Sequence, residues 1–486
     1  MYNNTLNNYI YLNGNNNIIA NNTVKTLRDY TVTTSSSAKN NTIVNNTLSS
    51  GMLSGDLSVS SNNNNIVENN TPKASTIIVT NNNYSQYFDA DGKIIPGTIQ
   101  SGSKILFSGN ITNKKFVFNN INVYLANNDT AVLYNSSIIS ENDSRIAIDG
   151  LKINNTDSSI GYVILLNSTN NKVINSEINV NTNGKIHAII LADDENTIQS
   201  TKVNVVGPSV DVTVKANNNR TAYGTVDGID IQSPTAGLLV SGNTLYNTRI
   251  NVDGDMYAYA LNIARAEETS TSLSYFTANS NNYAYALQIS GPSYNNNIAG
   301  YATATSTNVS YGAYLTGQWS GTVTNNSLEK FYIQNITAPT SIGVELEGVK
   351  NTTIGNATYR LYGDKNTGFI IINTNNTRIY AITSTSTSGN KNNTMMTITR
   401  SGNVTVTGNT FNQKVGNGII VSQSNNVNIT KNYLNIGNIT GGNAAVTNET
   451  SDNVTVESNT PTIILLTDET YTTYFDENAT LRDNIN

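Results

Sequence analysis

Two aspartates in the segment TVDGIDI, Asp227 and Asp230, have the residue type and spacing that best suit catalysis in this chain. Alternation along a strand would point Ile229 and Ile231 into a core and leave Asp230 on the outer face. Paired carboxylates about 6.5–9.5 Å apart can serve as acid and base in inverting glycoside hydrolysis. The neighbours that we expect beside Asp230 are the amides Asn262 and Gln288. On the rungs beside Asp230 the sequence therefore has amides where this chemistry needs a second carboxylate.

The other groups able to do chemistry are isolated from one another. His187, the only histidine, precedes an apolar strand, and we expect a structural or exposed imidazole. Asp193-Asp194 has no cluster of basic residues beside it. The segment DADGK, Asp89 to Lys93, shares the start of an EF-hand loop but lacks its later ligands, which favours a turn. We expect no catalytic residue, metal or cofactor.

Tyrosine pairs recur at a fixed spacing. They occur in the segments YAYALNI, YAYALQI and YGAYL, which start 26 and 28 residues apart. The residues are Tyr257 and Tyr259, Tyr283 and Tyr285, and Tyr311 and Tyr314. Stacked columns of these rings could pack on one another as structure. If exposed, they would offer flat apolar faces with hydroxyls to a sugar or a protein. We take these six residues and Asp230 as candidate ligand-binding residues.

The elements that position these residues repeat about every 25 residues. The segment NVTVTGNTF has anchors at Val406 and Phe411, and this odd separation puts side chains on opposite faces of a straight strand. Both can point inward only if the chain turns at Gly408-Asn409. The same pattern, apolar-x-x-Asn-x-apolar, recurs along the chain, as at Ile19, Ile43 and Val67, which are 24 residues apart.

A second pattern, a small residue followed by apolar-x-apolar, has the same period. It occurs at Gly343-Val344-Glu345-Leu346 and at Gly418-Ile419-Ile420-Val421, among other places. A unit of 23–27 residues cannot bury its own apolar side chains, but stacked units share a continuous core. The sequence therefore predicts an all-β parallel β-helix.

Asparagine at the turn has a physical reason. Its short amide tolerates the left-handed conformation of a sharp corner, and stacked amides can bond from rung to rung. The predicted ladder comprises Asn22, Asn46, Asn70, Asn243, Asn326, Asn409, Asn432 and Asn459.

Composition excludes several classes of function. The 486 residues are 37% hydrophobic and 12% charged, with a net charge of −6 and no run of Lys or Arg, which argues against a nucleic-acid surface. No stretch approaches the ~18 apolar residues of a membrane span, and no signal peptide opens the sequence. Asn-x-Ser/Thr sequons permit glycosylation, with candidates at Asn110, Asn167, Asn335, Asn403, Asn428 and Asn453.

A longer self-similarity suggests four parts. VENNTP at Val67 matches VESNTP at Val456, and TIIVTNNNYSQYFD at Thr76 matches IILLTDETYTTYFD at Ile463. We therefore expect terminal rungs of a preceding module at 1–70, a module start at 71–122, the main β-helix at 123–459 and a further module start at 460–486. On this interpretation the segment belongs to a longer multi-module chain.

Asn/Thr-rich rungs with a YFD module start resemble the adhesin-like surface proteins of methanogenic archaea. That resemblance implies a right-handed, pectate-lyase-like β-helix on the cell surface and a role in adhesion. The segment TVDGIDI also resembles part of the polygalacturonase motif, but that family's later Asp-Asp, Gly-His-Gly and Arg-x-Lys do not follow it. The main hypothesis is therefore a non-catalytic, extracellular adhesin-like segment that binds glycans or cell-surface proteins. A polysaccharide lyase or glycoside hydrolase and a structural spacer are the alternatives.

Overall fold

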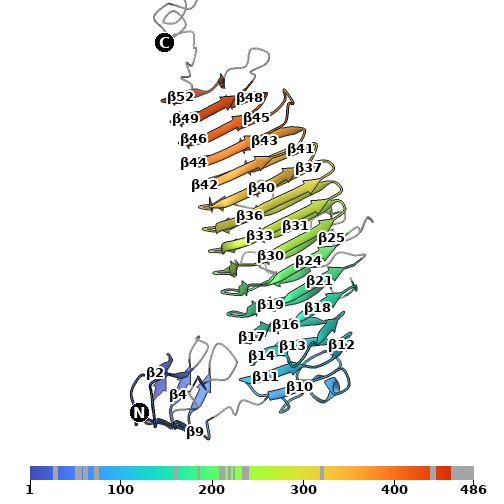
Figure 1. Ribbon diagram of the computed structural model, residues 1–486, viewed down its shortest axis with the longest axis vertical. Helices are drawn as coiled ribbons and strands as arrows, with labels where there is room; N and C mark the ends of the chain where they lie inside the picture. Colours follow the sequence, from blue (N-terminus) through green and yellow to red (C-terminus); the bar gives the residue numbers. More distant parts are fainter. Residues whose placement is uncertain are drawn as a thin grey trace, which may run out of the picture. The chain divides into compact units, whose positions relative to one another are not determined.

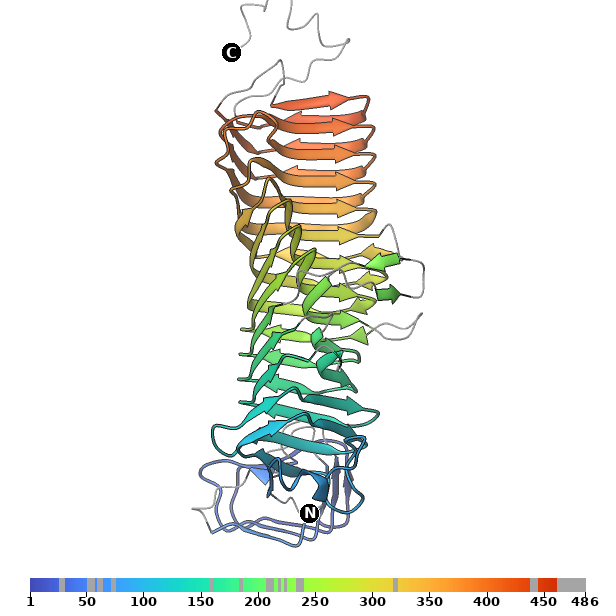
Figure 2. The same cartoon turned by 90° about the vertical axis from the view of Figure 1, so that its right-hand side faces the viewer.

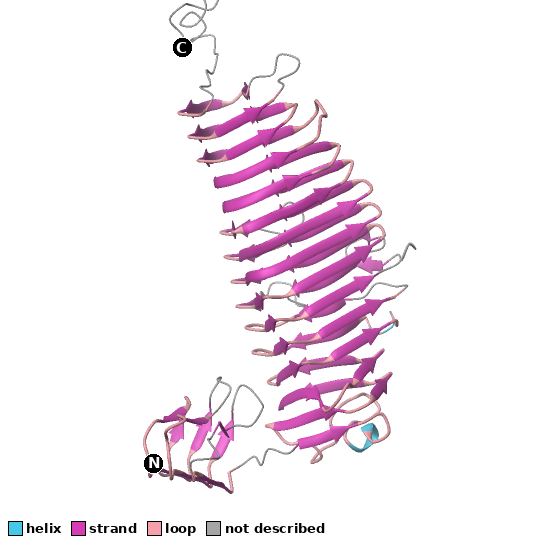
Figure 3. Cartoon of the chain, viewed as in Figure 1, coloured by secondary structure: helices cyan, strands magenta, loops and turns pink. Residues whose placement is uncertain are grey.

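The fold was analysed in a computed structural model. It describes residues 1–25, 31–49, 57–58, 64–70, 76–157, 159, 161–182, 187–206, 214–216, 220–222, 225–232, 240–317, 322–437 and 445–460. These residues form strands and turns almost throughout, with a short 3-10 helix, η2 (Tyr84–Gln86) (Figure 3). No helix among them has the length and apolar character that a membrane crossing requires.

The chain divides into two compact units, Met1–Ala278 and Asn279–Asn486. In each unit the strands pair in parallel with their equivalents in neighbouring rungs (Figures 1 and 2). Both units are therefore parallel β-helices, which confirms the predicted fold class. The four predicted parts have other boundaries than these two units and stay predictions.

The first nine strands of the first unit form three separate three-stranded parallel sheets. Their bounds are β1 (Thr5–Leu6), β2 (Ile10–Leu12), β3 (Ile18–Ala20), β4 (Thr23–Lys25), β5 (Val32–Thr34), β6 (Thr42–Val44), β7 (Thr47–Ser49), β8 (Leu57–Ser58) and β9 (Ile66–Glu68). Ile19, Val24, Ile43 and Leu48 lie in their shared core.

The remaining rungs contribute to two long sheets, here named sheet I and sheet II. Sheet I takes one strand from each rung. In the first unit these strands are β13 (Lys115–Asn119), β16 (Ser137–Glu141), β19 (Tyr162–Asn167), β22 (His187–Leu191), β27 (Thr225–Gln232) and β31 (Tyr257–Ala264). In the second they are β34 (Tyr283–Ser290), β37 (Val309–Thr316), β41 (Thr340–Glu347), β43 (Lys365–Ile372), β45 (Thr394–Thr399), β48 (Asn417–Ser422) and β51 (Val446–Glu449).

Sheet II takes the rest of each rung. Its strands in the first unit are β10 (Thr76–Val79), β11 (Ser103–Phe107), β12 (Asn110–Thr112), β14 (Asn122–Asn127), β15 (Val132–Tyr134), β17 (Arg145–Asp149), β18 (Lys152–Asn155), β20 (Lys172–Ile174), β21 (Glu177–Asn181), β23 (Thr197–Gln199), β24 (Lys202–Val206), β28 (Val240–Ser241), β29 (Thr244–Tyr246), β30 (Arg249–Gly254), β32 (Ala266–Glu267) and β33 (Ser270–Ser280). In the second unit they are β35 (Ser293–Tyr294), β36 (Asn297–Ser306), β38 (Val323–Thr324), β39 (Ser327–Glu329), β40 (Phe331–Thr337), β42 (Val349–Leu361), β44 (Asn375–Ser386), β46 (Gly402–Thr407), β47 (Thr410–Gln413), β49 (Asn425–Thr430), β50 (Tyr433–Ile436) and β52 (Asp452–Glu457). A separate antiparallel hairpin joins β25 (Val214–Ala216) and β26 (Arg220–Ala222).

The turn between β46 and β47 explains the odd spacing of Val406 and Phe411. Both side chains are buried, and Gly408 between them has a φ of 64°. The amide of Asn409 donates to Asn432 Oδ1 at 2.9 Å, and that of Asn432 donates to Asn459 Oδ1 at 3.0 Å. These buried amides link three successive rungs.

The prediction that the ladder asparagines themselves take the left-handed conformation is wrong. The left-handed residue at these corners precedes the bonded asparagine, as at Gly408, Lys431 and Ser458, whose φ values are 64°, 56° and 53°. Asn409 and Asn432 occupy the next position, where the side chain turns inward and bonds to the next rung. Asparagine is therefore needed there for its hydrogen bonds, and the neighbour absorbs the backbone turn.

The same ladder occurs at the other predicted positions. In the first unit the Asn22 amide donates to Asn46 Oδ1 at 3.0 Å, and Asn46 donates to Asn70 Oδ1 at 2.8 Å. Asn243 Oδ1 accepts the backbone N–H of Asn196 at 3.0 Å, and in the second unit Asn326 Oδ1 accepts that of Asn296 at 3.1 Å.

The small residue of the second pattern marks a close approach in sheet I. A Cβ on Gly343 would stand 2.4 Å from the carbonyl oxygen of Gly368. On either side of this position, Ser341 and Val344 are fully buried although they are three residues apart. The register of β41 with both neighbouring strands skips Gly343, so this strand bends here. The bend decides which side chains reach the outer surface.

Aromatic packing holds the YFD segment at Thr76 to Asp89. The Tyr84 ring stacks on Phe88 with centroids 5.2 Å apart, and Phe88 meets Phe116 edge-to-face at 5.1 Å. The carboxylate of Asp89 accepts the backbone N–H groups of Asp91 and Lys93 at 2.9 and 2.8 Å. The segment DADGK is thus a hydrogen-bonded turn after an aromatic anchor. The matching segment at Ile463 to Asp476 lies outside the described residues.

Candidate active site on sheet I

Three tyrosines and two glutamates gather on the outer side of sheet I in the second unit. Tyr285 pairs with Tyr311 across β34 and β37, and Tyr314 pairs with Glu345 across β37 and β41. Glu347 lies two residues beyond Glu345 on the same strand, so both side chains leave the same face. These five residues are named the tyrosine–glutamate cluster.

The bend in β37 brings two of these rings together. Tyr311 and Tyr314 are three residues apart, yet their ring centroids are 5.6 Å apart. Ser310, Ala313 and Leu315 are buried around them, so the two tyrosines occupy outward positions on either side of Gly312. A Cβ on Gly312 would stand 2.6 Å from the carbonyl oxygen of Gly343, so a side chain at this position of β37 would clash.

Stacking fixes the aromatic part of the cluster. The rings of Tyr285 and Tyr311 are nearly parallel, at 4°, with centroids 4.6 Å apart, and Tyr285 lies 6.0 Å from Tyr314. Tyr285 is buried, whereas Tyr311 and Tyr314 are half-buried. A buried ring therefore supports two rings that solvent or a ligand can reach.

The two glutamates differ in their surroundings. Burial, and then the negative charge of Glu347, raises the pKa of Glu345 to about 7. Glu347 accepts the hydroxyl of Tyr314 at 2.7 Å. Burial, and then Glu345, also raises the pKa of Tyr311 above its ordinary value, so its phenol stays protonated near neutral pH. At neutral pH one carboxyl is thus poised to hold a proton, while the other takes a hydrogen bond.

The cluster has the groups that acid–base chemistry needs. A carboxyl with a pKa near 7 can donate a proton to a leaving oxygen, as general acids do. Glu345 and Glu347 lie two residues apart on β41, which separates their Cα atoms by about 6.5–7 Å.

Sequence reasoning missed Glu345 and Glu347, although the signal was present. The pattern Gly343-Val344-Glu345-Leu346 alternates, so it already pointed Glu345 outward. The glutamates follow YGAYL by one rung, and only the strand register shows that they stand beside its tyrosines. The prediction that no residue is catalytic considered the aspartates Asp227, Asp230, Asp193 and Asp194, and not these glutamates.

The other predicted ligand-binding residues lie on β31, β34 and β27. Tyr257 and Tyr259 belong to the first unit, with centroids 6.3 Å apart and rings parallel within 4°. Tyr283 begins β34 and is half-buried. The backbone of Asp230 pairs with that of Asn262, as the alternation predicted, but the Asp230 side chain lies outside the described residues.

The remaining candidates take structural positions. His187 begins β22 and pairs with Tyr162 and Asp227. Asp194 accepts the backbone N–H of Ser241 at 2.5 Å, and burial raises the pKa of Asp193. In the described parts of the chain, no three His, Asp or Glu residues form a group that could hold a metal ion.

The glycosylation candidates differ in accessibility. Asn110, Asn403, Asn428 and Asn453 are exposed, whereas Asn167 and Asn335 are half-buried. Asn403 and Asn453 also donate to other asparagines, at 2.9 and 2.6 Å. All six stay predictions.

No known protein family and no curated protein matches this sequence. Solved structures with a similar course of the chain include a lidless DFA-IIIase from Arthrobacter chlorophenolicus A6 in complex with GF2. That similarity has 12% identity and a TM-score of 0.40, and covers 68% of this chain and 89% of the other. A GH136 lacto-N-biosidase from Eubacterium ramulus has 8% identity and a TM-score of 0.42, with 79% and 68% covered. The Dettilon tailspike protein has 13% identity and a TM-score of 0.39, with 74% and 68% covered. At these values the similarities assign no function to this chain.

Proposed function

We propose that this chain is a carbohydrate-active β-helix protein and that the tyrosine–glutamate cluster is its saccharide site. The observation that carries the proposal is the pair Glu345 and Glu347 beside two reachable tyrosine rings. Tyr311 and Tyr314 supply flat faces for a sugar ring, and the two carboxyls supply hydrogen bonds and a proton.

Hydrolysis with inversion is the reaction that fits this pair. Glu345 would donate its proton to the glycosidic oxygen as that bond breaks. Glu347, held by the Tyr314 hydroxyl, would take a proton from a water that attacks the anomeric carbon. The water oxygen then forms the new bond, and the two carboxyls exchange their protonation states.

Charge narrows the substrate class. The pKa of Glu345 is shifted by burial and by Glu347, with no contribution from a Lys, Arg or His. Two carboxyls side by side, with no cation among the described residues that shift the Glu345 pKa, disfavour uronates and sulfated sugars, which favours neutral glycans. The same absence disfavours a lyase that relies on a basic residue to remove a proton.

Binding without chemistry is the second candidate, as in the adhesin-like hypothesis. The observation that favours it is the stacking of Tyr285 on Tyr311, which serves a binding platform whether or not a bond breaks. An extracellular, cell-surface location and a place in a longer chain belong to this proposal.

The test compares glutamate variants on a panel of neutral and anionic polysaccharides. We expect the native chain to release reducing ends from a neutral glycan, and Glu345→Gln and Glu347→Gln each to lower the rate at least 100-fold. Glu329→Gln is the matched control, because Glu329 is also half-buried and accepts a tyrosine hydroxyl, that of Tyr380, at 2.6 Å. The control should keep the native rate.

The outcomes separate the candidates. Calorimetric binding of a neutral glycan without release of reducing ends would favour the binding function over hydrolysis. If no glycan is bound or cleaved, or if all three variants behave alike, the saccharide site is wrong.

A further inference from the structure

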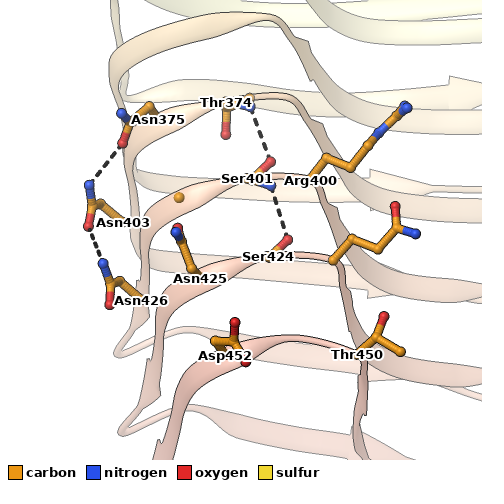
Figure 4. A pocket seen from close by; sticks show the side chains of 12 residues that line it. Thr374, Asn375, Arg400, Ser401, Asn403, Ser424, Asn425, Asn426, Thr450 and Asp452 are labelled. Atoms are coloured by element: carbon orange, nitrogen blue, oxygen red, sulfur yellow. Dashed lines mark hydrogen bonds between the residues drawn. The ribbon is translucent and has the colours of Figure 1, made fainter.

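A second, wholly polar groove lies in the last rungs of the second unit. It has a volume of about 500 Å³ and is lined by residues that follow β43, β45, β48 and β51 where the chain enters sheet II. In Figure 4, Arg400 and Thr450 stand on one side of the serine row, and Asn375, Asn403 and Asn426 stand on the other. This surface is named the corner groove.

The polar groups at the base of the corner groove form hydrogen bonds with one another. The backbone N–H of Thr374 donates to Ser401 Oγ, and that of Ser401 donates to Ser424 Oγ, both at 3.1 Å (Figure 4). These buried serines continue the rung-to-rung bonding of the interior.

The walls of the groove differ from its base. Arg400, Gln423, Asn425 and Asp452 are exposed, and their side chains have no hydrogen bond or ion pair within the part of the chain that the structure describes. Other amides of the lining bond to one another, as Asn426 does to Asn403 at 3.1 Å. The groove thus presents free donors and acceptors on adjacent rungs, about 4.8 Å apart.

Gly402 is a position without a side chain in one wall. By register, Asn375, Gly402, Asn425 and Asp452 form one column across four rungs. A Cβ on Gly402 would stand 2.7 Å from Asn425 Oδ1 and 3.6 Å from Asn375 Oδ1. The Asn425 amide therefore lies where a side chain at this position would begin, and a larger residue would displace it.

The outer asparagine ladder is displaced at the same rung. Asn376 donates to Asn351 at 2.9 Å, but Asn403 donates to Asn375, the neighbour of its register partner, also at 2.9 Å. The ladder therefore steps sideways beside Gly402, where the Asn375 amide oxygen accepts the bond from Asn403.

We propose that the corner groove binds a neutral oligosaccharide. Its lining has one cation, Arg400, and one anion, Asp452, so it has no net charge to select a charged polymer. It has no aromatic or large apolar side chain to hold a hydrophobic ligand. Amides and hydroxyls both donate and accept, which matches the hydroxyl groups of a sugar chain. Its volume lies within the range of small-molecule sites.

The test uses the full chain carrying Tyr311→Ala and Glu345→Gln, which disable the tyrosine–glutamate cluster and leave the corner groove intact. Cellohexaose, maltohexaose and chitohexaose are titrated calorimetrically. In this background, Gly402→Asn supplies the residue that both neighbouring rungs carry and displaces the Asn425 amide from the wall. We expect it to weaken the binding of the preferred hexasaccharide at least 10-fold.

Gly408→Asn is the matched control, because it lies on the same rung, has open space around its Cβ, and stands where other rungs carry asparagine. It should bind as the background does. Asn425→Ala removes one wall amide and should weaken binding about 3- to 10-fold, which tests the groove without a residue added at Gly402.

Three results would overturn the proposal. The first is that none of the three hexasaccharides binds in the background chain. The second is equal affinity of Gly402→Asn and Gly408→Asn. The third is a preference for an oligouronide that disappears with Arg400→Gln, which would make the ligand anionic.

Discussion

The asparagine ladder and the tyrosine–glutamate cluster both arise at bends of the chain, but their polar side chains face inward in the ladder and outward in the cluster. Both depend on a bend that puts residues of odd separation on one side of the chain. At Gly408-Asn409 the bend turns the side chains inward, and the amides bond to one another in the core. At Gly312 it turns Tyr311 and Tyr314 outward, where they stay half-buried. The comparison teaches that a repeated bend stabilises the stack when its polar groups pair inside the core, and offers a site when they stand on the outer surface.

The sharpest test of the inner half of this comparison is Asn432→Ala. Its amide donates to Val406 O and Asn459 Oδ1 at 2.9 and 3.0 Å, and its Oδ1 accepts from Asn409. Buried groups left without partners cost about 1–3 kcal/mol each, so we expect a loss of about 3–5 kcal/mol in the free energy of unfolding. Urea unfolding measures it. A loss below 1 kcal/mol would show that the ladder is not a stabilising element.

The second prediction concerns the tyrosine–glutamate cluster. Its Glu345 makes the free energy of unfolding depend on pH and lowers it at high pH. The pKa of Glu345 is raised from 4.5 to about 7, so the folded chain binds more protons than the unfolded chain between these values. The free energy of unfolding therefore falls as pH rises from about 4.5 to 7. Glu345→Gln removes this loss, and we expect it to be more stable than the native chain at pH 8 by up to about 3 kcal/mol.

The control for this prediction is the same pair of proteins at pH 4, where the native carboxyl is protonated and the difference should nearly vanish. Thermal unfolding at both pH values measures it. A difference that does not change with pH would contradict the raised pKa.

A smaller effect is expected for Tyr314→Phe. The change keeps the ring in the cluster and removes only the hydroxyl that donates to Glu347. A hydrogen bond to a charged group contributes about 1.5–3 kcal/mol, less where solvent reaches it, so we expect a loss of about 1–2 kcal/mol. Urea unfolding of Tyr314→Phe beside Tyr380→Phe, which removes a matching bond to Glu329, checks the value. No change in either variant would mean that neither bond contributes.

The smallest effect is expected for Asn425→Ala in the corner groove. Its side chain is exposed and makes no hydrogen bond in the described residues, so its loss should change the free energy of unfolding by less than about 0.5 kcal/mol. Asn432→Ala is the matching variant, because it makes the same substitution at an asparagine whose side chain is hydrogen-bonded. A similar loss in both would erase the distinction between ladder and groove.

Much of the fold could be predicted from the sequence, because its signals are local and repeat. The positions of Val406, Asn409 and Phe411 share a period with their equivalents, and side-chain alternation is a property of every strand. The left-handed residue was assigned one position too late, since both Gly408 and Asn409 tolerate a turn and only backbone geometry separates them.

The sequence by itself determined the rung, its length and the residues that face the core, because burial of apolar side chains at a fixed period admits few other arrangements. Only the tertiary structure decided what stands beside what on the surface. Glu345 lies 31 residues after Tyr314, and the strand register makes them neighbours. The strand register likewise places the amides of Asn375 and Asn425 on either side of Gly402. Rungs vary in length, so no fixed count along the chain predicts these contacts.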